Sequence, residues 1–317
     1  MAITMKYFIT GGAGFIGSNL VDRLMENKKN KIIVYDNLSS GKKEFIEKHI
    51  DKKNFNFIEA DLLDFEKLKF SMKGADIIFH LAANSNIPLG IKNTYLDLKQ
   101  NTLATYNVLE AMRINGIKKI VFTSSQTVYG ETGTKTVTED FPTRPISLYG
   151  ASKLACEALI TAYSHLFDIQ AWIFRFANIV GKRQTHGVII DFINKLKKNP
   201  DELEILGDGN QTKSYMLVDD CIDGILFAIK NSNDMTNIFN LGNDDQINVK
   251  NIAEIVAEEM HLKPKFKFTG GIRGWKGDVP VTILDTTKIK KLGWKPRINS
   301  EQSIKEAVRI LLKYDRD

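Results

Sequence analysis

The stretch Thr10-Gly11-Gly12-Ala13-Gly14-Phe15-Ile16-Gly17 decides the fold of this 317-residue chain. It lies between an apolar segment, Tyr7 to Thr10, which predicts a strand, and an amphipathic segment, Ser18 to Asn27, which predicts a helix. A glycine-rich turn that joins a strand directly to a helix is typical of dinucleotide-binding proteins, because the N-terminus of the helix then faces the phosphates.

The three spaced glycines of this turn have separate expected roles. Gly11 permits the tight turn, Gly14 lets the backbone approach a pyrophosphate, and Gly17 lets the helix pack against the strand. The next predicted strand, Lys31 to Asp36, ends in an acid. The Asp36 carboxylate would accept hydrogen bonds from both ribose hydroxyls and would repel a 2′-phosphate, so the pattern favours NAD over NADP.

The alternation of strands and helices continues along the first half of the chain. Apolar segments predict further strands, and two long amphipathic segments predict helices. This alternation predicts an α/β fold with a Rossmann doubly wound parallel sheet. The strands are expected at residues 55–59, 77–81, 120–124 and 172–177, and the helices at residues 101–115 and 149–167.

After about residue 178 the alternation gives way to loops, shorter helices and a turn at Gly207-Asp208-Gly209. We therefore expect an NAD-binding Rossmann domain over residues 1–177 and a smaller, mostly C-terminal α/β substrate domain over residues 178–317. Segments within residues 216–242 are expected to return to the first sheet, which would interleave the two domains. Asp219-Asp220 is expected to cap a helix there.

Composition narrows the classes of function. The net charge of +6 comes mostly from scattered lysines, so no nucleic-acid partner is predicted. The histidines show no ligand spacing, and no metal site is expected. Cys156 and Cys221 lie in separate apolar segments and indicate buried thiols in a reducing compartment. Met1 to Leu20 lacks a leader pattern and no long apolar segment follows, so we expect a cytoplasmic protein without a membrane partner.

A phenol and an ammonium lie four residues apart at Tyr149 and Lys153, on one face of the second long helix. A cation this close is expected to lower the pKa of the phenol. Such a tyrosine can take a proton from an alcohol while a hydride leaves the carbinol carbon. The spacing alone also fits an ordinary amphipathic helix, so the interpretation depends on the surrounding motifs.

Taken together, the motifs resemble those of the extended short-chain dehydrogenases/reductases, and within them the NAD-dependent nucleotide-sugar epimerases that are similar to UDP-glucose 4-epimerase. The resemblance covers nearly the whole chain. The motifs that carry it are Gly11-x-x-Gly14-x-x-Gly17, Asp36-Asn37-Leu38-Ser39-Ser40-Gly41, Asp61-Leu62, His80-Leu81-Ala82-Ala83, Asn101, Ser124-Ser125-x-x-Val128-Tyr129-Gly130, Tyr149-x-x-x-Lys153 and Arg175-Phe176-x-Asn178.

The resemblance implies a set of cofactor-binding residues. Asp61 and Leu62 would border the adenine, and Asn101 would support the active-site helix. The segment Leu81-Ala82-Ala83 would run along the NAD. The remaining implied positions are Gly11, Gly14, Phe15, Ile16, Gly17, Asp36, Asn37, Ser39, Gly41, Ser124, Tyr149 and Lys153.

The resemblance also implies that Ser125, Tyr149 and Lys153 are catalytic. Lys153 would hydrogen-bond the nicotinamide ribose and favour phenolate on Tyr149. Tyr149 would remove the proton of the sugar 4-hydroxyl, directly or through Ser125, as hydride passes from C4 to NAD. The resulting 4-keto sugar would take the hydride back on its other face, which inverts C4 and leaves NAD unchanged.

The residues that follow Ser125 narrow the reaction. Similar enzymes that remove water carry an Asp-Glu pair there, whereas this chain has Gln126-Thr127, whose side chains cannot supply that acid and base. Decarboxylating relatives need a glutamate close to the serine. Glu131 follows Tyr129-Gly130 and is expected in a loop. Epimerisation without loss of a group is the simplest remaining chemistry.

The second domain is implied to bind the nucleotide diphosphate. Asn178 ends a predicted strand, Val188 begins a predicted helix, and both would lie near the sugar diphosphate, as Ser125 and Tyr149 would lie near the sugar. Residues 207–215 resemble a hairpin that reaches the nucleotide. Lys213-Ser214 there replaces the usual Arg-Asp, so Lys213 would offer a point charge to phosphate in place of a bidentate fork.

A second departure lies at residues 273–280. Trp275 stands where many relatives have an arginine, so either Arg273 or Lys276 would supply the charge, while Asp278 would accept from a ribose hydroxyl. A charged surface turn is the alternative. Thr282 falls near a position where a bulky aromatic side chain excludes a 2-acetamido group, and a threonine leaves room for one.

These observations predict an isomerase, an NAD-dependent nucleotide-sugar 4-epimerase, with UDP-glucose and UDP-galactose as the favoured pair. The N-acetylated pair UDP-GlcNAc and UDP-GalNAc is the first alternative, followed by other UDP-sugar epimerases or oxidoreductases. A nonenzymatic NAD-sensing protein is a distant alternative, because such proteins tend to lose the Tyr149/Lys153 pair. Apolar residues on the two long helices, such as Leu103, Val108 and Leu109, predict a homodimer.

Overall fold

The computed structural model describes residues 4–274 and 277–314. They form two compact units. The first contains the described residues up to Val128 together with Ser147–Arg175 and Ile229–Phe239. The second contains Tyr129–Ile146, Phe176–Ala228 and the described residues from Asn240 onward. The functional domain boundary expected near residue 177 stays a prediction.

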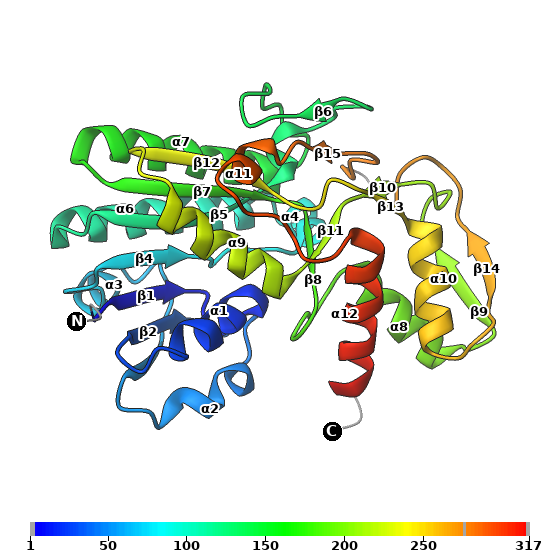
Figure 1. Ribbon diagram of the computed structural model, residues 1–317, viewed down its shortest axis with the longest axis horizontal. Coiled ribbons are helices and arrows are strands. Elements are labelled where there is room, and N and C mark those ends of the chain that lie inside the picture. The colour runs from blue at the N-terminus through cyan, green and yellow to red at the C-terminus, as the bar shows by residue number, and fades with distance from the viewer. Residues whose placement is uncertain (1–3, 275–276, 315–317) are drawn as a thin grey trace. The chain divides into compact units, whose positions relative to one another are not determined.

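A seven-stranded parallel sheet carries the first unit and confirms the Rossmann fold class. Its strand order is β12-β7-β5-β4-β1-β2-β3, and Figure 1 shows β12 to β2 one below another in this order. Ile9 in β1 is paired with Val34 on one side and Phe79 on the other. The strands are β1 (Lys6–Thr10), β2 (Lys31–Asp36), β3 (Phe55–Glu59), β4 (Ile77–His80), β5 (Lys119–Ser125), β7 (Gln170–Phe176) and β12 (Thr236–Leu241).

Helices connect these strands, and an apolar core lies between the sheet and several of them. This core joins strand residues to the inner faces of three helices, α3, α6 and α7. The helices of the unit are α1 (Phe15–Met25), α2 (Glu47–Ile50), α3 (Phe65–Ser71), α4 (Ile87–Lys92), α5 (Thr94–Asp97), α6 (Ala104–Asn115) and α7 (Leu148–Phe167), with short 3-10 turns η1 (Lys43–Phe45) and η3 (Gln126–Tyr129). Core members include Phe8, Tyr35, Leu68, Val108, Ile120 and Ile160.

Two helices begin differently from the sequence prediction. Helix α1 begins at Phe15, three residues earlier than expected, because Gly14 already serves as its N-cap with an extended backbone. The helix predicted over residues 101–115 begins as a π-helix, η2 (Leu98–Leu103), and continues as α6. Residue periodicity cannot reveal a π-turn, and such turns are frequent at functional sites.

The second unit is built from helices and pairs of short strands. Helices α8 (Val188–Lys198), α10 (Val249–Glu259) and α12 (Ser300–Tyr314) share an apolar core, and Figure 1 shows β9 and β14 beside α10. The strand pairs are β8 (Asn178–Val180) with β11 (Tyr215–Leu217), β9 (Glu202–Ile205) with β14 (Lys265–Phe268), β10 (Thr212–Lys213) with β13 (Ile247–Asn248), and β6 (Thr136–Val137) with β15 (Ile283–Leu284). Helix α11 spans Thr287–Lys291.

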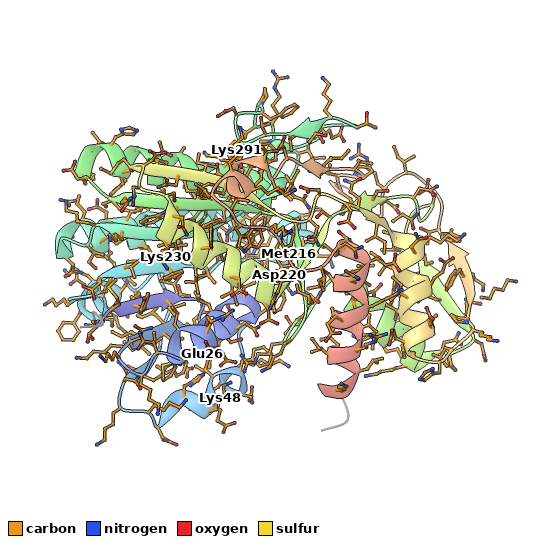
Figure 2. The ribbon with its side chains drawn as sticks, in the orientation of Figure 1. Glu26, Lys48, Met216, Asp220, Lys230 and Lys291 are labelled. Carbon is orange, nitrogen blue, oxygen red and sulfur yellow. The ribbon has the colours of Figure 1, made fainter. Side chains whose placement is uncertain are left out.

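Of the segments expected to return to the first sheet, β12 does so, whereas β11 pairs with β8 in a sheet of its own. Helix α9 (Val218–Asn231) follows β11 and carries Asp219 and Asp220 in its first turn. Figure 2 labels Asp220 beside Met216 of β11. The buried Asp220 carboxylate pairs with the Arg297 guanidinium and accepts the Arg297 backbone N–H at 3.0 Å. Asp220 thus fixes the segment that precedes α12.

Within the described residues, no helix is long and apolar enough to cross a membrane. Nor does any cluster of three histidine, cysteine or acidic side chains in that part of the chain form a candidate metal site. Cys156 and Cys221 are both free and buried thiols.

Candidate active site

The glycine-rich turn leaves no room for side chains at two of its glycines. Gly11 has a φ of +69°, and a Cβ there would lie 2.7 Å from the backbone nitrogen of Ala82. A Cβ on Gly17 would overlap the carbonyl oxygen of Gly11. The turn therefore lies directly against the segment after β4, where Leu81 N–H donates to Thr10 O at 3.2 Å.

The N-terminus of α1 is arranged to receive an anion. Its N-cap, Gly14, makes no side-chain capping bond, and no acidic residue occupies the first turn. Phe15 and Ile16 form the start of this turn. The positive end of the helix dipole and its unsatisfied N–H groups therefore point out of the turn, which is the arrangement that binds phosphate.

Asp36, at the end of β2, is held with its carboxylate against this turn. One oxygen accepts Ala13 N–H and the other accepts Leu38 N–H, each at 2.9 Å. Burial raises the pKa of Asp36, and the two backbone hydrogen bonds lower it in opposition. A Cβ on Gly41 would lie 3.1 Å from an Asp36 oxygen, so the loop after β2 closely covers the acid.

The loop after β2 is also tied to the loop after β3. Asn37 Nδ2 donates to Asp61 Oδ2 at 2.9 Å, and Asn37 Oδ1 accepts Ser39 N–H at 3.0 Å. Asp61 Oδ1 accepts Leu63 N–H at 2.9 Å. The neighbouring Leu62 is buried in the core of the unit. The polar side chains of Asp61 and Asn37 are therefore already joined to each other.

Ser125, Tyr149 and Lys153 are brought together by β5 and α7. Ser125 is the last residue of β5, and its Oγ accepts from Thr127 N–H at 3.2 Å and from Thr127 Oγ1 at 3.0 Å. Lys153 is buried, and its Nζ donates to Thr123 O at 2.7 Å. This Nζ also lies 5.8 Å from the centre of the Tyr149 ring.

The pKa of Tyr149 is raised, whereas the sequence predicted that it would be lowered. Burial raises it above its ordinary value, Asp97 raises it further, and a hydrogen bond with Ser125 lowers it only in part. The expected lowering by Lys153 was therefore wrong, because desolvation of the phenolate and the charge of Asp97 outweigh the groups that lower this pKa. Lys153 is itself perturbed, since burial lowers its pKa to about 8.

Asn101 joins the π-turn of η2 to helix α7. Its Nδ2 donates to Ser152 Oγ at 2.8 Å, and its Oδ1 accepts Asn84 N–H at 2.8 Å. Ser152 immediately precedes Lys153. The segment after β4, which includes Ala83, is thus linked through one buried amide to the helix that carries Tyr149 and Lys153.

A buried ion pair behind the site was missed by the sequence analysis. Glu157, one turn after Lys153, pairs with Arg175 of β7, with Nη2 at 2.7 Å from Oε2. Ser124 Oγ donates to the same carboxylate. All three side chains are buried. The available signal was a charged residue in an otherwise apolar helix face and another in an apolar strand.

His80 is a structural histidine at the end of β4. Its Nδ1 lies 2.7 Å from Thr10 Oγ1 and its Nε2 lies 2.9 Å from Thr105 Oγ1. Burial, with a smaller effect of Lys153, lowers its pKa to about 3. His80 is therefore neutral at physiological pH and ties the start of α6 to the glycine-rich turn.

The predicted substrate residues of the second unit are largely paired with one another. Lys213 Nζ lies 2.6 Å from Asp278 Oδ1, and Arg273 Nη1 donates to Asp278 O at 2.7 Å. The Arg273 guanidinium also pairs with Glu131. Lys276, the other candidate for the diphosphate charge, lies outside the described residues together with Trp275.

The other predicted substrate residues occupy defined positions in the same unit. Asn178 begins β8 and donates Nδ2 to Ser214 O at 3.2 Å. Val188 begins α8 after Gly187, whose φ is +102°. Thr282 is buried, and its carbonyl accepts from Gln246 at 2.7 Å. Their expected contacts with a sugar nucleotide stay predictions.

The first unit fits the cofactor implied by its motifs. It combines a turn without side chains, an uncapped helix N-terminus and a buried carboxylate at the end of β2. The turn and the helix N-terminus suit the pyrophosphate of NAD, and the carboxylate suits its ribose. The residues that would hold the adenosine half are Gly11, Gly14, Gly17, Asp36 and Asp61, while Lys153 and Tyr149 lie where the nicotinamide half is expected.

Comparison with known proteins supports the same cofactor. Residues 7–242 match the NAD dependent epimerase/dehydratase family. A solved UDP-galactose 4-epimerase is 39% identical, covers 98% of this chain and 99% of its own, and has a TM-score of 0.88. UDP-glucose 4-epimerase of Mycolicibacterium smegmatis is 30% identical over 96% of this chain and 97% of its own. UDP-N-acetylglucosamine 4-epimerase of Methanobrevibacter ruminantium M1, solved with UDP-N-acetylmuramic acid, is 26% identical over 99% of this chain and 100% of its own, with a TM-score of 0.88.

Proposed function

Because this chain belongs to the NAD dependent epimerase/dehydratase family, we propose that it is a nucleotide-sugar 4-epimerase that interconverts UDP-glucose and UDP-galactose. The observation that carries the proposal is the arrangement of Ser125, Tyr149 and Lys153 around the end of β5. A phenol, a hydroxyl and a buried ammonium at one place are the groups required to move a proton to and from an alcohol.

Each of these side chains has a defined task in the proposed reaction. NAD, when bound, supplies the chemistry that oxidises C4 of the sugar and later reduces it. Tyr149 takes the proton of the 4-hydroxyl, directly or through Ser125, and returns it after the 4-keto sugar has turned its other face. Lys153 has ammonium protons beyond the one that it donates to Thr123 O, and these would orient the nicotinamide ribose.

The reaction stops at epimerisation because an acid/base pair for elimination is missing. Gln126 and Thr127 stand where dehydrating relatives are expected to carry acids. Thr127 instead donates to Ser125 Oγ. Glu131, the nearest following carboxylate in sequence, is paired with Arg273 in the second unit. No loss of water is therefore proposed.

Relatives named for unsubstituted hexoses support glucose and galactose as the favoured pair, at 39% and 30% identity. UDP-GlcNAc and UDP-GalNAc form the second candidate. It is supported by the small side chain of Thr282 and by the 26% identical enzyme named for UDP-N-acetylglucosamine. Incubation of the protein with UDP-glucose and, separately, with UDP-GlcNAc, followed by NMR detection of the C4 epimer, decides between the two pairs.

Tyr149→Phe tests the proposed base. The variant should still bind NAD but epimerise about 10²- to 10⁴-fold more slowly, the range for loss of a general acid/base group. Parent-level epimerisation by this variant would refute the assignment of Tyr149. Stoichiometric release of NADH by the parent would instead indicate net oxidation, since an epimerase returns its cofactor unchanged.

We also propose a homodimer formed by α6 and α7. Exposed apolar residues lie on or just before these helices, including Leu103, Tyr106 and Leu166. Val108 and Leu109, which the sequence analysis placed among the dimer-forming residues, lie in the core of the unit instead. Light scattering should give twice the chain mass, and Tyr106→Lys combined with Leu166→Lys should give a monomer.

The two free, buried thiols support a cytoplasmic location.

A further inference from the structure

Lys153 is a buried cation whose charge must be balanced by its surroundings. Only 3% of the residue is exposed, and its Nζ donates a hydrogen bond to an uncharged acceptor, Thr123 O, at 2.7 Å. An ammonium that is removed from water is costly unless a negative charge lies nearby. Cys156, Glu157 and Asp97, in decreasing order, raise the pKa of Lys153 against the effect of burial, and the last two are buried carboxylates on different helices.

Glu157 already has a cationic partner. Arg175 Nε lies 3.1 and 3.2 Å from its two oxygens, and Nη2 lies 2.7 Å from Oε2. Ser124 donates to the same carboxylate. The Glu157 carboxylate is therefore already paired with a guanidinium of its own.

Asp97 has no cationic partner in contact with it among the described residues. The residue is 1% exposed, and its Oδ1 accepts from Asn84 Nδ2 at 2.8 Å and from Asn101 Nδ2 at 3.3 Å. Its Oδ2 is buried and has no hydrogen-bond partner. A Cβ on Gly90 of α4 would overlap this oxygen, so α4 covers it closely. Burial raises the pKa of Asp97, whereas its hydrogen bonds with Asn84 and Asn101 and the charge of Lys153 lower it. The groups that contact the carboxylate are thus neutral amides, and the cation that acts on it is Lys153.

The remaining titratable groups near Lys153 do not balance its charge. His80 of β4 is neutral because burial lowers its pKa to about 3. Cys156 of α7 has a raised pKa and is a neutral thiol. On α6, Glu110 is paired with Arg113 and hydrogen-bonded by Tyr163 towards the other end of α7.

We propose that Asp97 is the counter-charge of the Tyr149/Lys153 pair, and that it acts as a positioning residue for the reaction without touching the substrate. The proposal rests on the proposed function only in giving this pair its catalytic task. Asp97 favours the ammonium of Lys153 and opposes formation of phenolate on Tyr149. In the same position, its Oδ1 holds Asn84 and Asn101, which tie the segment after β4 to α7.

Asp97→Asn removes the charge and leaves the amide donors of Asn84 and Asn101 an oxygen to bind. Loss of the negative charge should lower the pKa of both Tyr149 and Lys153, each by about one unit, as expected for the removal of one nearby buried charge. Both limbs of the pH profile of kcat should therefore move together to lower pH. Asp97→Ser, which is also neutral but smaller, should produce the same displacement even if its rate or stability differs.

Tyrosinate absorbance provides a readout that does not need activity. The titration of Tyr149 is obtained as the difference between each protein and its Tyr149→Phe counterpart, and its midpoint should fall in both Asp97 variants. Glu110→Gln makes the same carboxylate-to-amide change on α6 and should leave this midpoint and the pH profile in place. Thermal unfolding, followed by circular dichroism, confirms that the variants are folded.

The possible outcomes distinguish the role proposed for Asp97 from the proposed function of the protein. Unchanged midpoints in Asp97→Asn and Asp97→Ser, with a rate lowered equally at every pH, would show that Asp97 is merely structural and would overturn this proposal. A midpoint displaced equally by Glu110→Gln would also overturn it. Full activity of Tyr149→Phe would overturn the proposed function instead, whatever the Asp97 variants show.

Discussion

Replacement of Lys153 by methionine tests whether the folded protein holds this ammonium at a cost. The pKa of Lys153 falls from its ordinary value of 10.5 to about 8 because the side chain is buried. At ~1.4 kcal/mol for each pKa unit, this drop corresponds to roughly 3 kcal/mol that opposes folding when the lysine is charged. Methionine has a similar apolar stem and carries no charge.

The pH dependence gives the direction of the effect. Below pH 8, the folded and unfolded chains both keep the proton, so the cost is complete and does not vary with pH. Between pH 8 and 10.5, the unfolded chain holds the proton that the folded chain has lost. The free energy of unfolding of the parent should therefore rise with pH in this window relative to Lys153→Met, by about 1.4 kcal/mol for each pH unit.

Urea denaturation of both proteins without cofactor, at intervals from pH 6 to pH 10, measures this difference. Loss of the bond to Thr123 O shifts the variant by the same amount at every pH, and other titrating groups largely cancel in the comparison. The difference should be flat up to pH 7 and should then change by about 2 to 3 kcal/mol by pH 10. A difference that stays constant over the whole range would refute the buried-ammonium interpretation.

Three further substitutions follow from the geometry of the first unit. Gly17→Ala places a methyl group on the Gly11 carbonyl oxygen, so it should destabilise the turn and abolish NAD binding, measured by calorimetry. Asp36→Ala removes the acceptor of two backbone N–H groups. It should raise the dissociation constant of NAD at least about tenfold, because a lost hydrogen bond to a charged group costs ~1.5 to 3 kcal/mol. An unchanged dissociation constant would contradict the assignment of Asp36 to the ribose. Glu157→Gln leaves the buried Arg175 without its counter-charge and should lower the free energy of unfolding by about 3 to 5 kcal/mol in urea, whereas a loss below ~1 kcal/mol would show that water reaches the pair.

The sequence could predict the parts of this fold that depend on local pattern. The strand expected over Lys31 to Asp36 has these bounds in the structure, because a short apolar run with a turn at each end has one register. The glycine-rich turn could also be predicted from the sequence, because Gly11 and Gly17 lie where no side chain fits. The start of α1 was missed by three residues, because Gly14 caps it without a side-chain signal.

The parts that escaped the sequence depend on contacts between distant residues. Glu157 and Arg175 form one buried pair although they lie on a helix and a strand, and no local pattern joins them. The pKa of Tyr149 was predicted in the wrong direction for a similar reason. Spacing on one helix showed the cation at Lys153, whereas the burial and the charge of Asp97 come from the surrounding fold.

The paired ions of the second unit change how a diphosphate would be bound there. Lys213 and Arg273 are both held by the Asp278 residue, one through its carboxylate and the other through its carbonyl. Asp278 is buried, so removal of Lys213 would leave its charge with a weaker partner, the Gly274 N–H at 3.3 Å. Separation of Arg273 from Glu131 costs less free energy, because that acid is half exposed and water can replace the guanidinium. Arg273 is therefore the better candidate of the two for exchanging its acid for phosphate, and Lys213 the better candidate for fixing Asp278 in place.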